Sequence, residues 1–367
     1  MSLPRPTGGV RRRRALALIS QLREAQAKLQ VGSIRLVIFS EGDAARGLGH
    51  LNRCLAYAEY VRARNGSVRW VVDGDAAAGR TLADGWPVDL RAWQADPTVA
   101  VDPDEIAIVD SYSATDAVMA AVARQARRTV FIDDYVRADY PTGPVSPGLV
   151  VHATPGPVQP RGRAQWLTGP LWQPLKPAFS DIPRRDAVPR TVGRVLVAFG
   201  ATDLRGLAGP AVGWVRQVFP DAAVDVILGQ GVAHTDPALD APGVTIHHRL
   251  APDAVARLMT AADLAVGAAG QTLYEWACCG LPGVLVGVAE NQRPHMDRWP
   301  PTGAFLAAGW WDNPDIAARA VVALKALAPP EPRLAAARAG QAAVDGRGVE
   351  RLFERLSTDT TDSDAPT

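Results

Sequence analysis

Residues 47–53 combine a flexible turn with a side chain that can move a proton. Their order is Gly-Leu-Gly-His-Leu-Asn-Arg, with Gly49 directly before His50. Glycine lets a ligand approach the backbone closely, and histidine gains or loses a proton near neutral pH. His50 is therefore a candidate general base, and the alternative is a structural residue near the start of a helix.

The same segment differs from the common phosphate-binding motifs. No Gly-Lys-Ser or Gly-Lys-Thr follows the turn, which excludes a P-loop, and Asn52 occupies the third glycine position of a dinucleotide-binding fingerprint. Arg53 stands one helical turn further on, where it could hold a phosphate or pair with Glu59 or Asp43. The segment is thus a candidate anion site without a known cofactor signature.

A second segment, residues 266–275, brings small residues to the expected start of a helix. Free amides at a helix start, together with the partial positive charge of the helix dipole, can hold a diphosphate. Glu275 lies about one turn into that helix, where a carboxylate suits a pair of ribose hydroxyls. The alternative is a plain strand–helix turn in which Glu275 stabilises the dipole. The polar cluster Glu290-Asn291-Gln292 follows the next strand and favours ligand binding.

Acidic residues follow two strands in the first half of the chain. Asp110 and Tyr112 come after one short apolar run, and Asp133 and Asp134 come after the next. Closely placed carboxylates can bind a metal, cap helices, hydrogen-bond a sugar or orient His50. No spaced set of aspartate, glutamate and histidine ligands accompanies them, so the sequence predicts no metal site.

The residues with candidate chemistry stand at the ends of apolar runs that alternate with helical patterns. One such series spans residues 34–132 and the other spans 195–287. This alternation is typical of parallel sheets covered by helices, which bind ligands beyond the carboxyl ends of their strands. Gly200 and Thr202 follow a strand of the second series. Their loop offers amides and a hydroxyl to a nucleotide, or it is a simple helix cap.

The fold class that follows is α/β, with two Rossmann-like domains whose parallel sheets face each other across a cleft. Prolines recur between Pro141 and Pro189, and because proline removes amide donors and breaks helices, the domain crossover is expected there. The expected divisions are an N-terminal helical extension (1–32), a Rossmann-like domain (33–165), a proline-rich linker (166–190), a second Rossmann-like domain (191–330), a C-terminal helix (331–356) and a disordered tail (357–367).

Composition narrows the class of protein and its partners. The chain has 367 residues, 47% of them hydrophobic, and a net charge of +1. These values suit a soluble two-domain protein and give no reason to expect a nucleic-acid partner. Three cysteines cannot form a disulfide framework, so buried thiols in a reducing cytoplasm are expected. No apolar stretch approaches the roughly 18 residues that span a bilayer, so no stable membrane insertion is expected.

Seven segments together resemble a known family. They are Gly-Leu-Gly-His-Leu-Asn-Arg-Cys at 47–54, Val-Asp-Ser-Tyr at 109–112, Ile-Asp-Asp at 132–134, Phe-Gly-Ala-Thr-Asp at 199–203, Ala-Ala-Gly-Gln-Thr-Leu-Tyr-Glu at 268–275, Gly-Leu-Pro at 280–282 and Ala-Glu-Asn-Gln at 289–292. In this order and spacing, residues 33–330 resemble the nucleotide-sugar hydrolase of pseudaminic acid biosynthesis and its spore-coat polysaccharide relatives. That family has the GT-B glycosyltransferase fold and is distantly similar to the lipid II synthase that adds N-acetylglucosamine.

The resemblance implies an enzyme that needs no metal or cofactor and binds a UDP-sugar. His50 matches the family's base, which activates water for inverting attack at the anomeric carbon of the sugar as UDP leaves. The turn at 268–272 would hold the diphosphate, Glu275 the ribose, and Asn291 would face the sugar. The expected nucleotide-binding residues are Gly200, Thr202, Ala269, Gly270, Gln271, Thr272 and Glu275. The expected residues on the sugar side are Gly49, Arg53, Asp110, Tyr112, Asp134, Glu290, Asn291 and Gln292.

The chain departs from the family pattern at three points. Ala201 replaces a glycine, Gln271 replaces the serine of the diphosphate turn, and His152-Ala153-Thr154 replaces an Asn-Gln-Asn-like segment. These differences bear on the choice of sugar and acceptor. Two alternatives to the hydrolase stay open. One is a glycosyltransferase that uses the same donor site and histidine on an acceptor hydroxyl, and the other is a non-catalytic protein that binds sugar nucleotides.

Overall fold

The N-terminal half of the chain is built on a parallel sheet. The computed structural model describes residues 34–43, 46–82, 85–136, 138–143, 148–200, 203–229 and 236–358. Within them, seven strands pair in the order β3-β2-β1-β4-β5-β6-β7, and their pairings are parallel. The strands are β1 (Arg35–Gly42), β2 (Ser67–Gly74), β3 (Val88–Leu90), β4 (Glu105–Asp110), β5 (Arg128–Ile132), β6 (Leu149–His152) and β7 (Gln165–Thr168).

Helices follow strands of this sheet, and two of them begin at side-chain caps. The helices are α2 (Gly49–Arg62), α3 (Ala76–Thr81) and α4 (Asp116–Gln125). The side chains of Asp75 and Thr115 accept hydrogen bonds from first-turn amides of α3 and α4, as good N-caps do. No side-chain cap covers the start of α2, where Leu48 is the N-cap residue.

The C-terminal half repeats the architecture with a second parallel sheet. Among its described residues, six strands pair in the order β10-β9-β8-β11-β12-β13. They are β8 (Arg194–Ala198), β9 (Ala223–Ile227), β10 (Val244–His247), β11 (Leu264–Ala268), β12 (Gly283–Gly287) and β13 (Phe305–Trp310). The helices of this half are α5 (Ala208–Val218), α6 (Pro252–Ala261), α7 (Thr272–Cys278), α8 (Arg293–Arg298), α9 (Ile316–Ala326) and α10 (Pro330–Ala343). Short 3-10 turns are η1 (Pro170–Trp172), η2 (Pro177–Phe179), η3 (Pro237–Asp240), η4 (Glu290–Gln292) and η5 (Pro300–Thr302).

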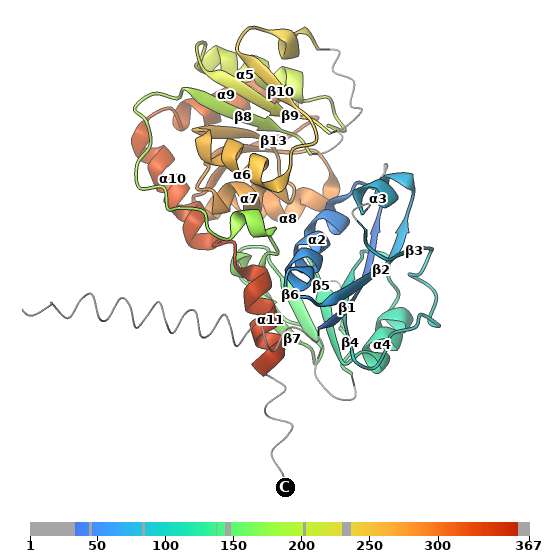
Figure 1. Cartoon of the computed structure of the whole chain (residues 1–367). Coiled ribbons are helices and arrows are strands. Elements are labelled where there is room, and N and C mark those ends of the chain that lie inside the picture. Colours follow the sequence, from blue (N-terminus) through green and yellow to red (C-terminus); the bar gives the residue numbers. More distant parts are fainter. Residues whose placement is uncertain are drawn as a thin grey trace, which may run out of the picture.

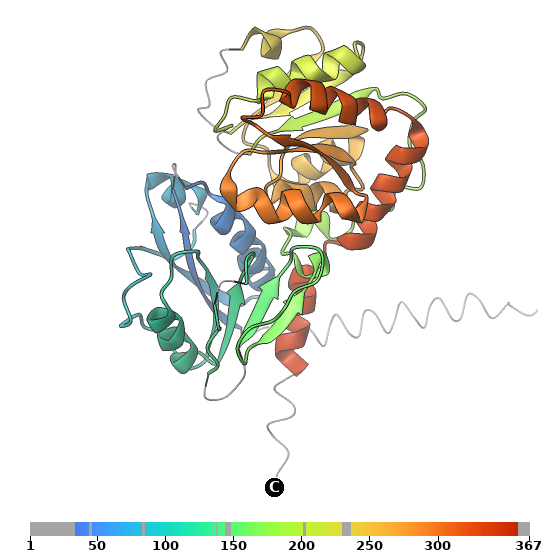
Figure 2. The same cartoon turned by 180° about the vertical axis from the view of Figure 1, so that it is seen from behind.

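Each sheet is buried on both faces. Two apolar clusters cover the faces of the first sheet and two cover those of the second. Strands that are buried on both faces have continuous apolar sequences, so most of these strands could be predicted from the sequence. Figures 1 and 2 show the two sheets with their helices as separate lobes.

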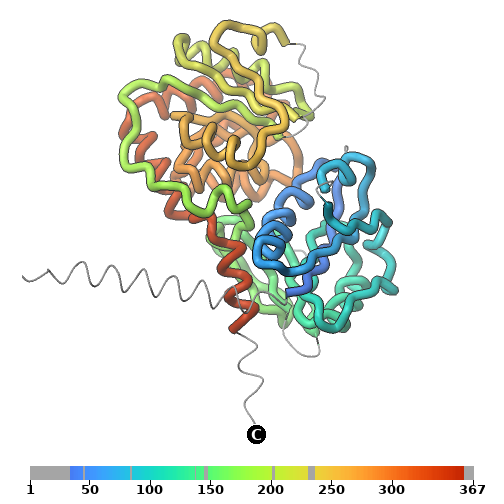
Figure 3. Tube along the Cα trace, viewed as in Figure 1, coloured from blue at the N-terminus to red at the C-terminus, as the bar shows by residue number. Residues whose placement is uncertain are grey.

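The last helix, α11 (Gly348–Thr358), returns to the first lobe. Its buried side chains Val349, Leu352, Phe353 and Leu356 belong to the apolar cluster of the first sheet. Figure 1 shows α11 beside the first lobe, and Figure 3 shows that both the linker and the C-terminal chain pass between the lobes. The chain thus connects the two lobes twice.

Several expected boundaries differ from the observed elements. The expected linker at 166–190 begins inside β7, which pairs with β6 and belongs to the first sheet. The expected helix at 331–356 is two helices, α10 and α11, and α11 runs on to Thr358. The extension at 1–32 and the rest of the expected tail lie outside the described residues. In the described part of the chain, no helix is long and apolar enough to cross a membrane.

Candidate functional site

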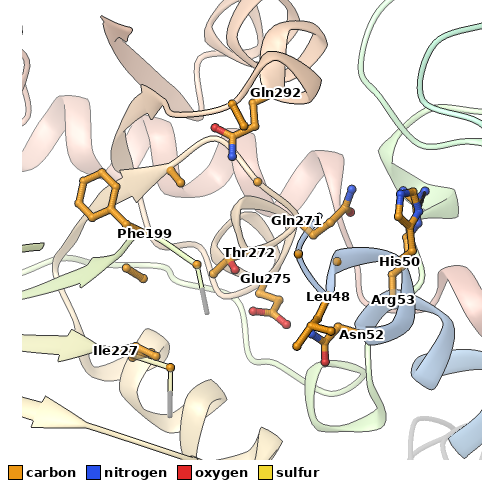
Figure 4. Close-up of a pocket in the computed structure, with 18 of the residues that line it drawn as sticks. Leu48, His50, Asn52, Arg53, Phe199, Ile227, Gln271, Thr272, Glu275 and Gln292 are labelled. Carbon is orange, nitrogen blue, oxygen red and sulfur yellow. Dashed lines mark hydrogen bonds between the residues drawn. The ribbon is translucent and has the colours of Figure 1, made fainter. Parts of the chain in front are cut away.

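A cavity of about 900 Å³ lies between the two lobes, at the carboxyl ends of strands from both sheets. Most of the residues singled out from the sequence line it, namely Gly49, His50, Arg53, Tyr112, Gly200, Gly270, Gln271, Thr272, Glu275, Asn291 and Gln292. Asp110, Asp134, Ala269 and Glu290 do not, and Thr202 lies outside the described residues. Figure 4 shows His50 and Arg53 on one side of the cavity and Gln271, Thr272 and Glu275 on the other.

His50 is held by a carboxylate from the neighbouring strand. Its Nδ1 lies 2.6 Å from Oδ1 of Asp110, the last residue of β4. Burial would raise the pKa of Asp110, but the charges of Arg53 and His50 outweigh it and hold this pKa well below its usual range. An ionised carboxylate only accepts hydrogen bonds, so His50 Nδ1 carries the proton. In the neutral imidazole, the other ring nitrogen, Nε2, then keeps its lone pair.

Arg53 connects two buried carboxylates. Its guanidinium donates to Asp110 at 2.6 and 2.7 Å and to Asp134 at 2.9 and 3.0 Å. The residue is only 5% exposed, and it contacts neither of the partners suggested by the sequence, Glu59 and Asp43. The sequence predicts that Arg53, Asp110 and Asp134 belong to the sugar side of the site. In the structure their charged groups bond one another, and Arg53 lines the cavity whereas the two aspartates do not.

Tyr112 forms the wall beside His50. The two rings meet edge to face with their centroids 4.3 Å apart, and the Tyr112 hydroxyl donates to Asp134 at 2.6 Å. Burial and the Asp134 charge raise the pKa of Tyr112 well above its usual value, so the phenol stays protonated. Tyr135 packs against Tyr112, and its hydroxyl donates to the backbone oxygen of Asn291 in the other lobe, at 2.8 Å.

Glu41, which sequence reasoning missed, holds the loop that carries Tyr112. It lines the cavity directly after Ser40 in β1 and is 4% exposed. It accepts hydrogen bonds from the Tyr112 amide at 2.6 Å, from Gln94 at 3.0 Å and from the Ser113 hydroxyl. Burial would raise the pKa of Glu41, but these hydrogen bonds outweigh it and lower the pKa. Its place at a strand end was the signal that could have found it.

The turn between β11 and α7 forms the opposite wall. Its first intrahelical bonds run from the Leu273 amide to Gly270 and from the Tyr274 amide to Gln271, so the amides of Gly270, Gln271 and Thr272 precede them. Ala269 is different from what the sequence suggested. Its amide donates to the Val286 carbonyl at 3.1 Å and is therefore not free for a phosphate, and its carbonyl accepts from Nδ1 of His295 at 2.8 Å.

Glu275 lines the cavity one turn into α7. Burial raises the pKa of its carboxyl from 4.5 to about 7, and it outweighs the charge of Lys176, which lowers this pKa. The carboxyl therefore changes its charge near neutral pH. Both residues line the cavity, Lys176 from the linker and Glu275 from the second lobe.

The polar cluster after β12 is divided between the cavity and the surface. Asn291 and Gln292 line the cavity, and Gln292 is held by a bond from the Val288 amide to its Oε1 at 3.0 Å. Glu290, which the sequence predicts on the sugar side, does not line the cavity. Its side chain is 76% exposed and pairs with Arg293 at 2.6 Å on the same helical segment.

The linker also contributes to the cavity, which the sequence did not indicate. Gln173, Pro174, Leu175, Lys176 and Phe179 all line it. Gln173 is 2% exposed and hydrogen-bonds Gln271. The many prolines of this segment signalled a crossover but gave no hint of ligand contact.

The chain is similar in sequence to a known protein. No protein-family model matches the chain. The spore coat polysaccharide biosynthesis protein SpsG of Bacillus subtilis (strain 168) is 25% identical over 198 residues, or 52% of this chain. The match covers 58% of SpsG, so the chain spans less than two thirds of that relative. The chain thus resembles a protein of spore-coat polysaccharide biosynthesis, as the sequence motifs suggested.

Solved structures of other proteins superpose on most of this chain. MurG of Acinetobacter baumannii superposes with a TM-score of 0.60 at 15% identity, covering 89% of this chain and 99% of MurG. The calicheamicin glycosyltransferase CalG4 gives 0.56 at 16% identity, covering 89% and 98%. The chain has the GT-B fold. MnaA of S. aureus, solved with UDP, gives 0.57 at 10% identity and covers 90% of this chain and 99% of MnaA.

Proposed function

We propose that the protein binds a UDP-sugar in the cavity and hydrolyses its glycosyl–phosphate bond, with His50 as the base that activates water. The His50–Asp110 pair carries this proposal. Its 2.6 Å contact fixes the proton on Nδ1, so Nε2 is free to accept a proton. The histidine lines the cavity, and its side chain is 16% exposed.

The proposed reaction is a single displacement. The water oxygen bonds to the anomeric carbon while the bond from that carbon to the β-phosphate oxygen breaks. His50 Nε2 takes the water proton, and the electron pair of the broken bond leaves with UDP. Attack from the side opposite the leaving group inverts the anomeric centre. UDP is stable as an anion, so one base on the water side is enough.

The donor side of the cavity supports a nucleotide-sugar. The amides of Gly270, Gln271 and Thr272 would hold the diphosphate, and Glu275 would bind the ribose hydroxyls. Asn291 and Gln292 would contact the sugar. The structural similarity to a protein solved with UDP and the sequence similarity to SpsG support this donor class.

A glycosyltransferase is the second candidate. The same base would then deprotonate an acceptor hydroxyl, and CalG4, one of the structurally similar proteins, is a glycosyltransferase by name. The two reactions differ only in the nucleophile, so the same residues serve either one.

Release of UDP without an acceptor separates these candidates. The purified chain is incubated with a panel of UDP-sugars in buffer alone, and UDP is measured over time. We expect release from at least one donor, and a loss of about 100-fold or more in the His50→Ala variant. Arg62→Ala, at the far end of the same helix, serves as the control and should keep full activity. Release only after an acceptor alcohol is added would establish the transferase, and full activity of His50→Ala would reject its role as base.

A further inference from the structure

Two glutamines join the linker to the donor side of the cavity. Gln173 Nε2 donates to Gln271 Oε1 at 2.8 Å. Gln173 follows η1 in the linker and is 2% exposed, whereas Gln271 is the N-cap residue of α7 and is half-buried. Both residues line the cavity. The contact therefore ties the segment that connects the lobes to the turn that faces the ligand.

The surroundings of Gln173 fix the orientation of both carboxamides. The Gln173 Nε2 atom also lies 3.5 Å from the carbonyl oxygen of Pro174, a position that an amide oxygen would avoid because two acceptors repel. Gln173 therefore presents its NH₂ group to Gln271, and the oxygen of Gln271 is occupied. No other described residue hydrogen-bonds the Gln271 side chain, so its NH₂ group remains for a ligand. In Figure 4 this side chain extends from the start of α7 toward the side that carries His50.

Gln173 also carries a buried polar atom that destabilises the fold, which suggests a role beyond packing. Its Oε1 is buried and has no hydrogen-bond partner in the part of the chain that the structure describes. A buried acceptor without a partner destabilises a fold and is worth an explanation. An apolar side chain of similar length would fill the same space without that cost. Orientation of Gln271 explains why a glutamine stands there.

We propose that Gln271, oriented by Gln173, donates a hydrogen bond to a β-phosphate oxygen of a bound nucleoside diphosphate. This inference rests on the proposed function and extends it to a specific contact with the leaving group. Negative charge gathers on the β-phosphate as its bond to the sugar breaks, and a fixed donor aimed there stabilises that charge without rearrangement. Gln271 is then a binding residue, and Gln173 is a positioning residue.

Binding of UDP and of uridine to a small set of variants tests the contact. Gln271→Met removes the donor, and we expect it to weaken UDP binding about tenfold or more while uridine binding stays unchanged. Gln173→Met removes the orienting bond and should weaken UDP binding less. Gln173→Glu offers only acceptor atoms, so it should turn the Gln271 carboxamide around and point its oxygen at the phosphate. We expect this variant to lose at least as much UDP affinity as Gln271→Met.

The double variant Gln173→Glu/Gln271→Met separates orientation from plain charge repulsion. If Gln173 acts through Gln271, the double variant binds UDP as Gln271→Met does, because no carboxamide is left to turn. If Gln173→Glu weakens binding equally in both backgrounds, its charge acts directly and the positioning role is rejected. Unchanged UDP binding by Gln271→Met overturns the inference while leaving the proposed function in place. If the unaltered chain binds no UDP, the proposed donor fails and this inference fails with it. Melting curves confirm that each variant is folded.

Discussion

The chemistry of His50 depends on three charged side chains that lie beside its ring. Asp110 and Asp134 are ionised and Arg53 is protonated, so the three buried groups together carry one net negative charge beside the ring. A proton taken from water would make His50 positive, and the adjacent carboxylate of Asp110 stabilises that state. Arg53 keeps the two carboxylates from repelling each other. The proposed base is thus supported by an ion cluster rather than by a single partner.

Glu275 should make the stability of the protein depend on pH. Its pKa is about 7 in the folded chain and 4.5 as an ordinary glutamate, so the folded state holds the proton to higher pH. Stability from this group is full below about pH 4.5 and is lost as the pH rises through about 7. Glu275→Gln should therefore raise the free energy of unfolding at pH 8 by up to about 3 kcal/mol and change it little near pH 4.5. Melting temperatures measured at the two pH values check this. Glu354→Gln, on the exposed face of α11, is the control for the lost charge, and an equal gain at both pH values would contradict the explanation.

At the scale of elements, the sequence predicted the sheets well because their strands are buried on both faces. It missed β3, β7 and β13, for different reasons. None of the three residues of β3 is buried, so this strand has no apolar signal. The residues of β7 lie in a proline-rich segment, and only one of the four is buried. Its hydrogen bonds to β6, and not an apolar pattern in its own sequence, define this strand. The strand β13 lies at the edge of its sheet and is half-buried along much of its length, so its apolar signal is weak.

The same limit explains which parts of the site were predicted. His50 and Asp110 were each visible as polar residues after a strand, but their contact follows from β1 lying beside β4. That order depends on the whole sheet, and sequence spacing does not reveal it. Gln173 was invisible because a glutamine between prolines carries no signal of its own. The sequence predicts which polar residues stand at strand ends, but it does not predict which of them contact one another across neighbouring strands.

Gly267 shows how one strand depends on a missing side chain. It lies in β11 at the centre of the second sheet, just before the turn that lines the cavity. A Cβ atom there would stand 1.8 Å from the Ala198 oxygen and 3.0 Å from the Trp276 ring. The backbone of a central strand is held by hydrogen bonds on both sides, so moving it costs much free energy. Gly267→Ala should therefore destabilise the protein by about 3 kcal/mol or more, as measured by urea unfolding. Gly213→Ala in α5, where an added Cβ meets nothing within 4 Å, should instead stabilise by about 0.5–1 kcal/mol.

At the scale of the whole molecule, the C-terminal helix makes the first lobe depend on the end of the chain. The aromatic ring of Phe353 in α11 stacks on Tyr60 of α2, with centroids 5.0 Å apart and planes 5° apart, and it is 2% exposed. Arg351 of the same helix donates to the Leu171 carbonyl, and Arg355 donates to Gln165 of β7 at 3.0 Å. The helix that follows the second lobe in sequence is therefore part of the core of the first.

Phe353→Ala should weaken the first lobe selectively. Removing a buried phenylalanine costs about 3–5 kcal/mol, because apolar contacts are lost and a cavity remains. Since Phe353 packs only into the cluster of the first sheet, amide hydrogen exchange should speed up in α2 before it does in α5. Val322→Ala on α9 is the matched control, because that side chain is 67% exposed and its loss should change stability by less than about 0.5 kcal/mol. Equal acceleration of exchange in both lobes would instead show that they unfold as one unit, with α11 transmitting the loss from the first sheet to the second.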